Sequence, residues 1–294
     1  MAISLHRPKR ILTASFVVTA VVAIVEVVGG ILSDSISLVS DAVHVFTDVI
    51  AIGLSLFAIT MAARSHSGAM TFGYHRAEVM AALANGIGLA VISVWILYEA
   101  FFRVLSPRTI DAPLMLLTAG IGLAGNLVVI FLLKKQARKS INVQSAFVHV
   151  VYDTLSSVAV IITGFVALNT GITIVDPLVA FLIAGLVARG AYLIVRSSTH
   201  ILLEGAPREL DILEITDTLK QLEGVVDVHD LHVWTISTGM DALSGHVVVH
   251  DQMLSESGKL LSEIKKLLAE RYNITHTTIQ LEHENEISFR RTIK

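Results

Sequence analysis

The 294-residue sequence contains no cysteine, and charged residues make up only 16% of it. Without cysteine there is no disulfide framework, no thiolate metal site and no cysteine nucleophile, so a bound metal ion needs His, Asp, Glu or water as ligands. The net charge of -3 is too small to favour a nucleic-acid partner. Because 53% of the residues are hydrophobic and the mean hydropathy is +0.70, a soluble globular domain is disfavoured as well. These features predict an integral membrane protein in contact with the lipid bilayer.

Six apolar stretches meet or approach the length of about 20 residues that a helix needs to cross a bilayer. They cover residues 11–32, 36–62, 78–102, 113–133, 145–168 and 175–196. The first follows a basic segment, but it is longer than the core of a signal peptide and lacks a convincing cleavage site, so we expect a first span. Most flanking basic residues follow the second, fourth and sixth spans: Arg64, Arg76, Lys134, Lys135, Arg138, Lys139, Arg196 and Arg208. The positive-inside rule therefore places both termini in the cytoplasm.

The composition changes near residue 204, where the long apolar runs end and charged residues become frequent. We therefore predict a six-helix transmembrane domain over residues 1–203 and a small cytoplasmic α+β domain over residues 204–294. The second part has helical patterns at 210–222 and 260–268 and strand patterns at 225–236, 242–250 and 277–282. The order helix, strand, strand, helix, strand fits helices packed on one face of a small sheet.

Two of the predicted spans carry the same pair of ionisable residues at a spacing of four. The second span contains His44 and Asp48, and the fifth contains His149 and Asp153. This spacing places both side chains of a pair on one face of a helix, one turn apart. Two such helices facing each other offer two imidazoles and two carboxylates to one ion, a set that suits tetrahedral zinc and balances its charge.

A structural role for these residues is the first alternative, because an intramembrane His or Asp can bond one helix to another. An ionised side chain at the bilayer centre costs about 2.5–3.5 kcal/mol on insertion scales, so four ionisable groups in matched pairs favour an ion pathway. A membrane metalloenzyme is a second alternative, but no His-Glu-x-x-His pattern is present. A metal sensor or channel is a third, although the later spans are mainly apolar.

Asp41 is expected behind the ligands or on an access path, and Glu26 has no assigned partner.

The set of motifs resembles the cation diffusion facilitator family, in its zinc-type branch. Besides the two His-x-x-x-Asp pairs, the resemblance rests on residues 72–78 (FGYHRAE), 176–177 (DP), 228–234 (VHDLHVW) and 278–282 (TIQLE). It implies a homodimeric secondary active transporter, not an enzyme, with a ferredoxin-like cytoplasmic domain. The implied substrate is Zn²⁺, with Cd²⁺ and Co²⁺ as alternatives, moved out of the cytoplasm by alternating access in exchange for protons. The short connection after the fourth span suggests a prokaryotic cell membrane.

The chemistry of the ligands predicts that protons and zinc compete for the same site, because a metal-binding His must be neutral and a metal-binding Asp ionised. The exchange of one for the other across the membrane is what the resemblance implies. The resemblance further implies a cytoplasmic metal site at His229, His246 and Glu282, with His276 or His283 as additional ligands and Zn²⁺ as a regulatory ion. It also pairs the position of Arg76 with an acidic residue after the sixth span, which here is Glu204.

Overall fold

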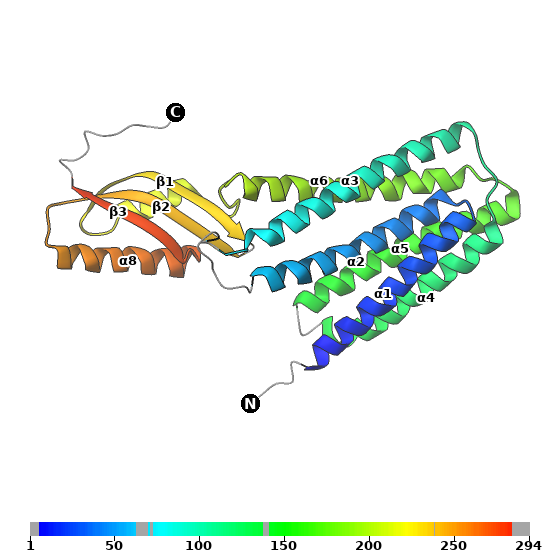
Figure 1. Cartoon of the computed structure of the whole chain (residues 1–294), viewed down its shortest axis with the longest axis horizontal. Helices are drawn as coiled ribbons and strands as arrows, with labels where there is room; N and C mark the ends of the chain where they lie inside the picture. The colour runs from blue at the N-terminus through cyan, green and yellow to red at the C-terminus, as the bar shows by residue number, and fades with distance from the viewer. Residues whose placement is uncertain (1–5, 63–69, 71–72, 138–140, 238, 284–294) are drawn as a thin grey trace. The chain divides into compact units, whose positions relative to one another are not determined.

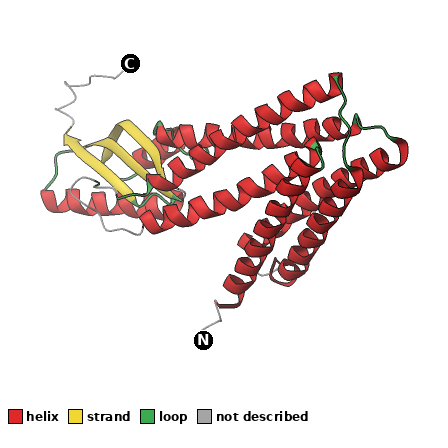
Figure 2. Cartoon of the chain, turned by 45° about the vertical axis from the view of Figure 1, so that its right-hand side comes forward, coloured by secondary structure: helices red, strands yellow, loops and turns green. Residues whose placement is uncertain are grey.

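The computed structural model describes residues 6–62, 70, 73–137, 141–237 and 239–283. Arg64, Arg138 and Lys139 lie outside the described residues, as do the side chains of Asp48 and Lys135. Six long helices come first along the chain, and all strands follow them (Figures 1 and 2). The helices are α1 (His6–Leu32), α2 (Ile36–Ala62), α3 (Arg76–Leu105), α4 (Ala112–Ala137), α5 (Ile141–Thr170) and α6 (Val175–Leu202). Each predicted apolar stretch lies within one of them.

Within the part of the chain that the structure describes, five of these helices are long and apolar enough to cross a membrane. They are α3 and α6 throughout, α1 over Ala14–Leu32, α4 over Ala112–Lys134 and α5 over Phe147–Thr170. In α2 the described apolar section, Ile36–Thr47, is shorter. Large apolar side chains such as Val91, Phe131 and Phe165 are more than half exposed, as a bilayer requires of the outer face of a helix. The predicted membrane helical domain is therefore confirmed, with five candidate spans.

The residues form two compact units, one of Met1–Phe57 with Ala81–Val195 and the other of Ala58–Met80 with Arg196–Lys294. In the first unit, buried apolar clusters join the helices. One cluster connects α2, α3 and α6, a second connects α2, α4, α5 and α6, and a third connects α4 with α5. The helices that carry the paired motifs, α2 and α5, are thus held by several neighbours rather than by each other alone.

The start of α2 is fixed by a buried carboxylate in the first turn of α6. Asp176, which is 1% exposed, accepts hydrogen bonds from the hydroxyls of Ser35 and Ser37 at 2.6 Å each and from the backbone N–H of Ile36 at 2.8 Å. These bonds satisfy donors that the first turn of a helix otherwise leaves without partners. The Asp-Pro motif noted in the sequence therefore anchors α2 to α6.

The second unit contains a three-stranded mixed sheet. Strands β1 (Val225–Ser237) and β2 (Met240–Val249) are antiparallel, and β3 (His276–His283) runs parallel to β2 at the other side, in the order β1-β2-β3. Helix α7 (Ile212–Lys220) precedes β1, and α8 (Leu254–Tyr272) supplies the crossover that parallel neighbours need. The predicted element order is confirmed.

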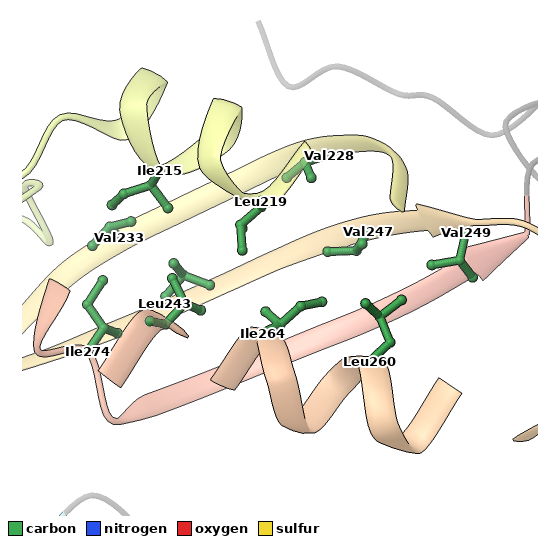
Figure 3. Packing of buried hydrophobic residues seen from close by; sticks show 11 residues of the cluster. Ile215, Leu219, Val228, Val233, Leu243, Val247, Val249, Leu260, Ile264 and Ile274 are labelled. Atoms are coloured by element: carbon green, nitrogen blue, oxygen red, sulfur yellow. The ribbon is translucent and has the colours of Figure 1, made fainter. Parts of the chain in front are cut away.

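The core of this sheet domain lies between the two helices and one face of the strands (Figure 3). Leu219 of α7 and Ile264 of α8 are fully buried against Leu243 and Val247 of β2. The two strand residues differ by four, so they share one face of the sheet. Both helices therefore cover the same face, as predicted, and each large apolar side chain contributes about 1.5–3 kcal/mol by its burial.

Candidate metal sites

Helices α2 and α5 bring three of the four predicted transport ligands together. His44 Nε2 lies 3.6 Å from Asp153 Oδ1, and His149 Nε2 lies 3.9 Å from Asp153 Oδ2. The two imidazole rings meet edge to face, with centroids 5.7 Å apart. One ligand atom from each residue lies within 4.8 Å of the others. Ligands of a tetrahedral zinc ion at about 2.0–2.2 Å lie roughly 3.3–3.6 Å from one another, so small shifts would fit an ion here.

The three side chains differ in exposure. Asp153 is buried, with 3% of its side chain exposed, whereas His44 and His149 are 28% and 44% exposed. A buried carboxylate flanked by two more open imidazoles is a site that an ion can enter from one side. Asp48 lies one helical turn after His44 in α2, but its side chain is outside the described part of the chain, so its role as the fourth ligand stays a prediction.

Behind Asp153 lies a buried polar network that joins α2, α4 and α5. The Ser156 hydroxyl donates to Asp41 Oδ1, and the Ser157 hydroxyl donates to Asp41 Oδ2 at 3.1 Å. Both hydroxyls also lie within 3.0 Å of the Asp153 carbonyl oxygen, and Asn126 of α4 donates to Ser157 at 3.3 Å. Asp41 therefore stands behind the ligands, where the sequence reasoning expected it. The two serines were missed, although their spacing of three and four from Asp153 was a visible signal.

The second candidate site lies on the sheet and takes one residue from each of the three strands. His229 pairs directly with His246 across β1 and β2, and Glu282 comes from β3. His246 Nδ1 lies 2.5 Å from Glu282 Oε1, and His229 Nε2 lies 3.0 Å from Glu282 Oε2. The two rings are stacked, with centroids 5.2 Å apart. The structure thus brings together all three residues that the sequence named.

Glu282 has a perturbed acidity that suits a metal ligand. Burial raises the pKa of its carboxyl, but the hydrogen bonds from His246 and His229, with the charge of the two imidazoles, outweigh burial and hold the pKa below its usual range. The side chain therefore stays ionised at neutral pH, which is the form that binds a metal ion.

The two further histidines considered as ligands stand at opposite ends of β3. His276 pairs with Ala242 and His283 with Val249, and neither belongs to the three-residue group within 4.8 Å. Asp230, which sequence reasoning did not single out, lies closer. It occupies an irregularity of β1 with a φ of 51°, and its carboxylate oxygens lie 3.2 Å from His232 Nε2 and 3.8 Å from His246 Nε2.

The predicted pairing of Arg76 with Glu204 is present within the second unit. Arg76 Nη2 donates to Glu204 Oε1 at 2.9 Å. Glu78 accepts a hydrogen bond from Ser237 of β1 at 3.1 Å, so the start of α3 is tied to the sheet within this unit. Both contacts connect the sequence motif at residues 72–78 to the C-terminal part of the chain.

Comparison with known families gives matches along nearly the whole chain. Residues 12–203 match the cation efflux transmembrane domain, and residues 207–284 match the cytoplasmic domain of cation efflux proteins. The "Cadmium, cobalt and zinc/H(+)-K(+) antiporter" of Bacillus subtilis is 39% identical, covering 94% of this chain and 89% of that protein. The zinc transporter ZitB of Escherichia coli is 37% identical, covering 96% of this chain and 91% of that protein.

A third relative, the "Metal cation efflux system protein CzcD" of Cupriavidus metallidurans, is 37% identical, covering 93% of this chain and 86% of that protein. A solved structure, titled the metal-bound C-terminal domain of the CzcD transporter, is also 37% identical. It covers 25% of this chain and 99% of that chain, with a TM-score of 0.23. With so low a score, this likeness is one of sequence and not of superposed structure.

Proposed function

The chain belongs to the cation diffusion facilitator family, in its zinc-type branch, and we propose that it exports divalent metal ions from the cytoplasm, with Zn²⁺ as the main substrate. The observation that carries this proposal is the convergence of His44, His149 and Asp153 from two separate helices. Relatives of similar length are named for zinc, cadmium and cobalt, which keeps Cd²⁺ and Co²⁺ as further substrates. Two His with carboxylates accept all three ions.

The transport site consists of His44, Asp48, His149 and Asp153. Asp48 completes the set because its position one turn from His44 repeats the spacing of His149 and Asp153. Protons and metal compete for these groups, since the imidazoles bind metal only when neutral and the carboxylates only when ionised. A site that faces the two sides of the membrane in turn would then exchange metal for protons. This makes the protein a secondary active transporter driven by the proton gradient.

The architecture that serves this function crosses the membrane six times, because α2 adds one span to the five candidate spans. Both termini then lie in the cytoplasm. Residues 1–203 form the transmembrane domain, and residues 204–294 form a ferredoxin-like cytoplasmic domain. Two chains associate as a homodimer in a prokaryotic inner membrane. The family match of residues 207–284 supports the cytoplasmic placement, and the α-β-β-α-β order supports the fold.

The sheet site has a regulatory role in this proposal. His229, His246 and Glu282 would bind a Zn²⁺ ion on the cytoplasmic side, where the free metal concentration is to be controlled. Support comes from the three strands that fix these residues in one place and from the lowered pKa of Glu282, which keeps a charged ligand ready. The site lies outside the helices that carry the paired motifs, so its ion is not the transported one.

The test is zinc uptake into proteoliposomes under an imposed proton gradient, with Asp48→Ala and Asp153→Ala compared with the unaltered chain. Asp217→Ala, which removes an exposed carboxylate from α7, is the matched control. We expect gradient-driven uptake in the parent and the control and its loss in both site variants. Uptake that survives in Asp48→Ala and Asp153→Ala would assign the paired motifs a structural role and overturn the transport site.

A further inference from the structure

The turn between α1 and α2 is held to α3 by one arginine side chain. Arg103, near the end of α3, has only 10% of its side chain exposed. Its guanidinium donates to Asp34 Oδ1 at 2.7 Å and to the backbone carbonyl oxygen of Asp34 at 2.5 Å. Asp34 has a φ of 52°, a left-handed conformation that Asp and Asn adopt more readily than other residues except glycine. Both the side chain and the backbone of this turn residue are therefore fixed from α3.

The contact stands at the end of the helices where the candidate transport site is closed. Figure 1 shows the α1–α2 turn and the end of α5 at the same end of the helical unit. Leu38 precedes His44 in α2, and Val160 follows Asp153 in α5, so both lie between the candidate ligands and that end. With Met115 of α4 they form one apolar cluster, and all three side chains are 0% exposed. A metal ion cannot cross such a packed apolar layer without losing its hydration, so the site is shut on this side.

The ion pair of Arg103 with Asp34 can separate without leaving a charge unpaired. The Asp34 side chain is 46% exposed, so water can take the place of the guanidinium. Arg103 Nε also lies 3.0 Å from Glu99 Oε1, one turn earlier in α3, and this carboxylate moves with the arginine. A buried ion pair is hard to break mainly because one charge is left without a partner, and here both charges keep one. Asp176, which also holds the start of α2, is 1% exposed, so its hydrogen bonds are shielded from water.

We propose that the contact between Arg103 and Asp34 is a releasable latch, which closes the transport site toward the side of the membrane where the α1–α2 turn lies. The latch parts in the step in which the metal ion leaves on that side. This inference rests on the proposed metal export, in which the site faces the two sides of the membrane in turn. With both termini in the cytoplasm, the turn lies one crossing away from the N-terminus, on the outer side. When Arg103 withdraws from Asp34 and keeps Glu99, α3 is free to move away from the turn and to open the path past Leu38.

The absence of cysteine from the chain allows a test with one introduced thiol. Ser40 lies in α2 between Leu38 and His44, is 1% exposed, and its hydroxyl has no hydrogen-bond partner among the described residues. Ser40→Cys is therefore nearly isosteric and breaks no described hydrogen bond. A small, membrane-impermeant thiol reagent is added to spheroplasts from the outside, and the rate at which it modifies the thiol reports how often the outer path is open.

The latch variant in this background is Asp34→Asn, which removes the charge, keeps the size of the side chain and suits the left-handed backbone. We expect modification from the outside to be about two- to fivefold faster, the effect of losing a partly exposed ion pair. Arg108→Gln is the matched control, because Arg108 is 58% exposed and pairs with Glu99 at 3.3 Å in the same charged group. It leaves the contact between Arg103 and Asp34 in place, so the rate should not change.

Equal modification rates with Asp34 and with Asn at this position overturn the inference. Modification that becomes faster by the same factor from the cytoplasmic side, measured in inside-out vesicles, would show loosened packing and overturns it as well. In a chain with Asp34→Cys and Arg103→Cys, a short bifunctional thiol reagent should abolish gradient-driven zinc uptake while zinc still binds, and uptake that persists after complete crosslinking also refutes the latch. Modification of the thiol is read without transport, so a parent that exports no zinc refutes the proposed function separately.

Discussion

Replacing Asp41 by Asn should weaken zinc binding at the transport site while leaving all four proposed ligands in place. Asp41 is fully buried in α2, and its two oxygens accept the hydroxyls of Ser156 and Ser157 in α5. The same serines lie within 3.0 Å of the Asp153 carbonyl oxygen. Asp41 therefore holds one turn of α5, the turn that carries Asp153, against α2. This keeps Asp153 close to His44.

The size of the effect follows from these two contacts. A hydrogen bond to a charged acceptor contributes about 1.5–3 kcal/mol, and a neutral one about 0.5–1.5 kcal/mol. Asn keeps one acceptor oxygen and loses the charge, so the network loses about 1–3 kcal/mol. If the whole of this free energy serves to position Asp153 for the ion, zinc affinity falls about 5- to 150-fold, since 1.4 kcal/mol is a factor of ten. Residues that orient metal ligands have effects of about 10–100-fold.

The assay is equilibrium zinc binding to the purified full-length protein, with the sheet site disabled by His229→Ala in every sample. Asp176→Asn provides a matched control, because Asp176 is also buried and also accepts two serine hydroxyls, but at the start of α2. We expect Asp176→Asn to lower thermal stability with little change in zinc affinity. Equal zinc affinity in Asp41→Asn and the parent would refute the reasoning, as would an equal loss of affinity in both Asn variants.

Three further substitutions test the packing and the sheet site. Gly122→Ala should lower the thermal stability by about 1–3 kcal/mol through its clash with Glu26, whereas Gly120→Ala, with open space around it, should be neutral or slightly stabilising in the same thermal scans. Leu243→Ala should destabilise the sheet domain by about 2–5 kcal/mol, measured by denaturant unfolding, because Leu243 is 1% exposed in its core. The pKa of Glu282 is lower in the folded protein than its ordinary value of about 4.5. The ionised carboxylate therefore stabilises the folded protein at pH values above about 4.5, and this stabilisation is lost as the pH falls through the pKa of the folded state. Glu282→Gln should remove that part of the pH dependence of unfolding, and an unchanged pH profile would contradict the assignment.

The sequence was sufficient to predict the helices and strands. Apolar runs of bilayer length and strands with period-two patterns are local features, so every predicted stretch overlaps an observed element of the same type. The helix predicted at 210–222 is shorter in the structure, as Ile212–Lys220, and the strand predicted at 242–250 is Met240–Val249. The His-x-x-x-Asp pairs were predictable for the same reason, because a spacing of four fixes the relative direction of two side chains on any helix. The resemblance named His229 and His246 as ligands of one site, and the register of β1 and β2 places them directly opposite each other.

Features that depend on tertiary packing were not predictable. Glu26 looked like an isolated polar residue, because nothing local indicates that α4 presents a glycine to it. Ser156 and Ser157 are ordinary helix residues until α2 places Asp41 beside them. The strained backbone at Asp230, with φ of 51°, arises where β1 gains a residue relative to β2, and no residue pattern in a single sequence marks that position.

The two candidate sites use the same kinds of ligand but differ in the distances between them. In the transport site, the two imidazole nitrogens lie 3.6 and 3.9 Å from Asp153, beyond the length of a normal hydrogen bond. In the sheet site, Glu282 already accepts bonds from His229 and His246 at 3.0 and 2.5 Å. An ion entering the sheet site must therefore replace two hydrogen bonds whose donor protons sit on the ligand nitrogens themselves.

Protons and zinc compete for the imidazole nitrogens at both sites, so zinc affinity at each site should fall as the pH falls from about 7.5 to 6. The two sites can be isolated in full-length protein with Asp153→Ala, which leaves the sheet site, and His229→Ala, which leaves the transport site. Zinc affinity measured at both pH values in each variant gives the two slopes. Zinc affinity that is the same at both pH values in Asp153→Ala would contradict proton competition at the sheet site, and the same result in His229→Ala would contradict it at the transport site.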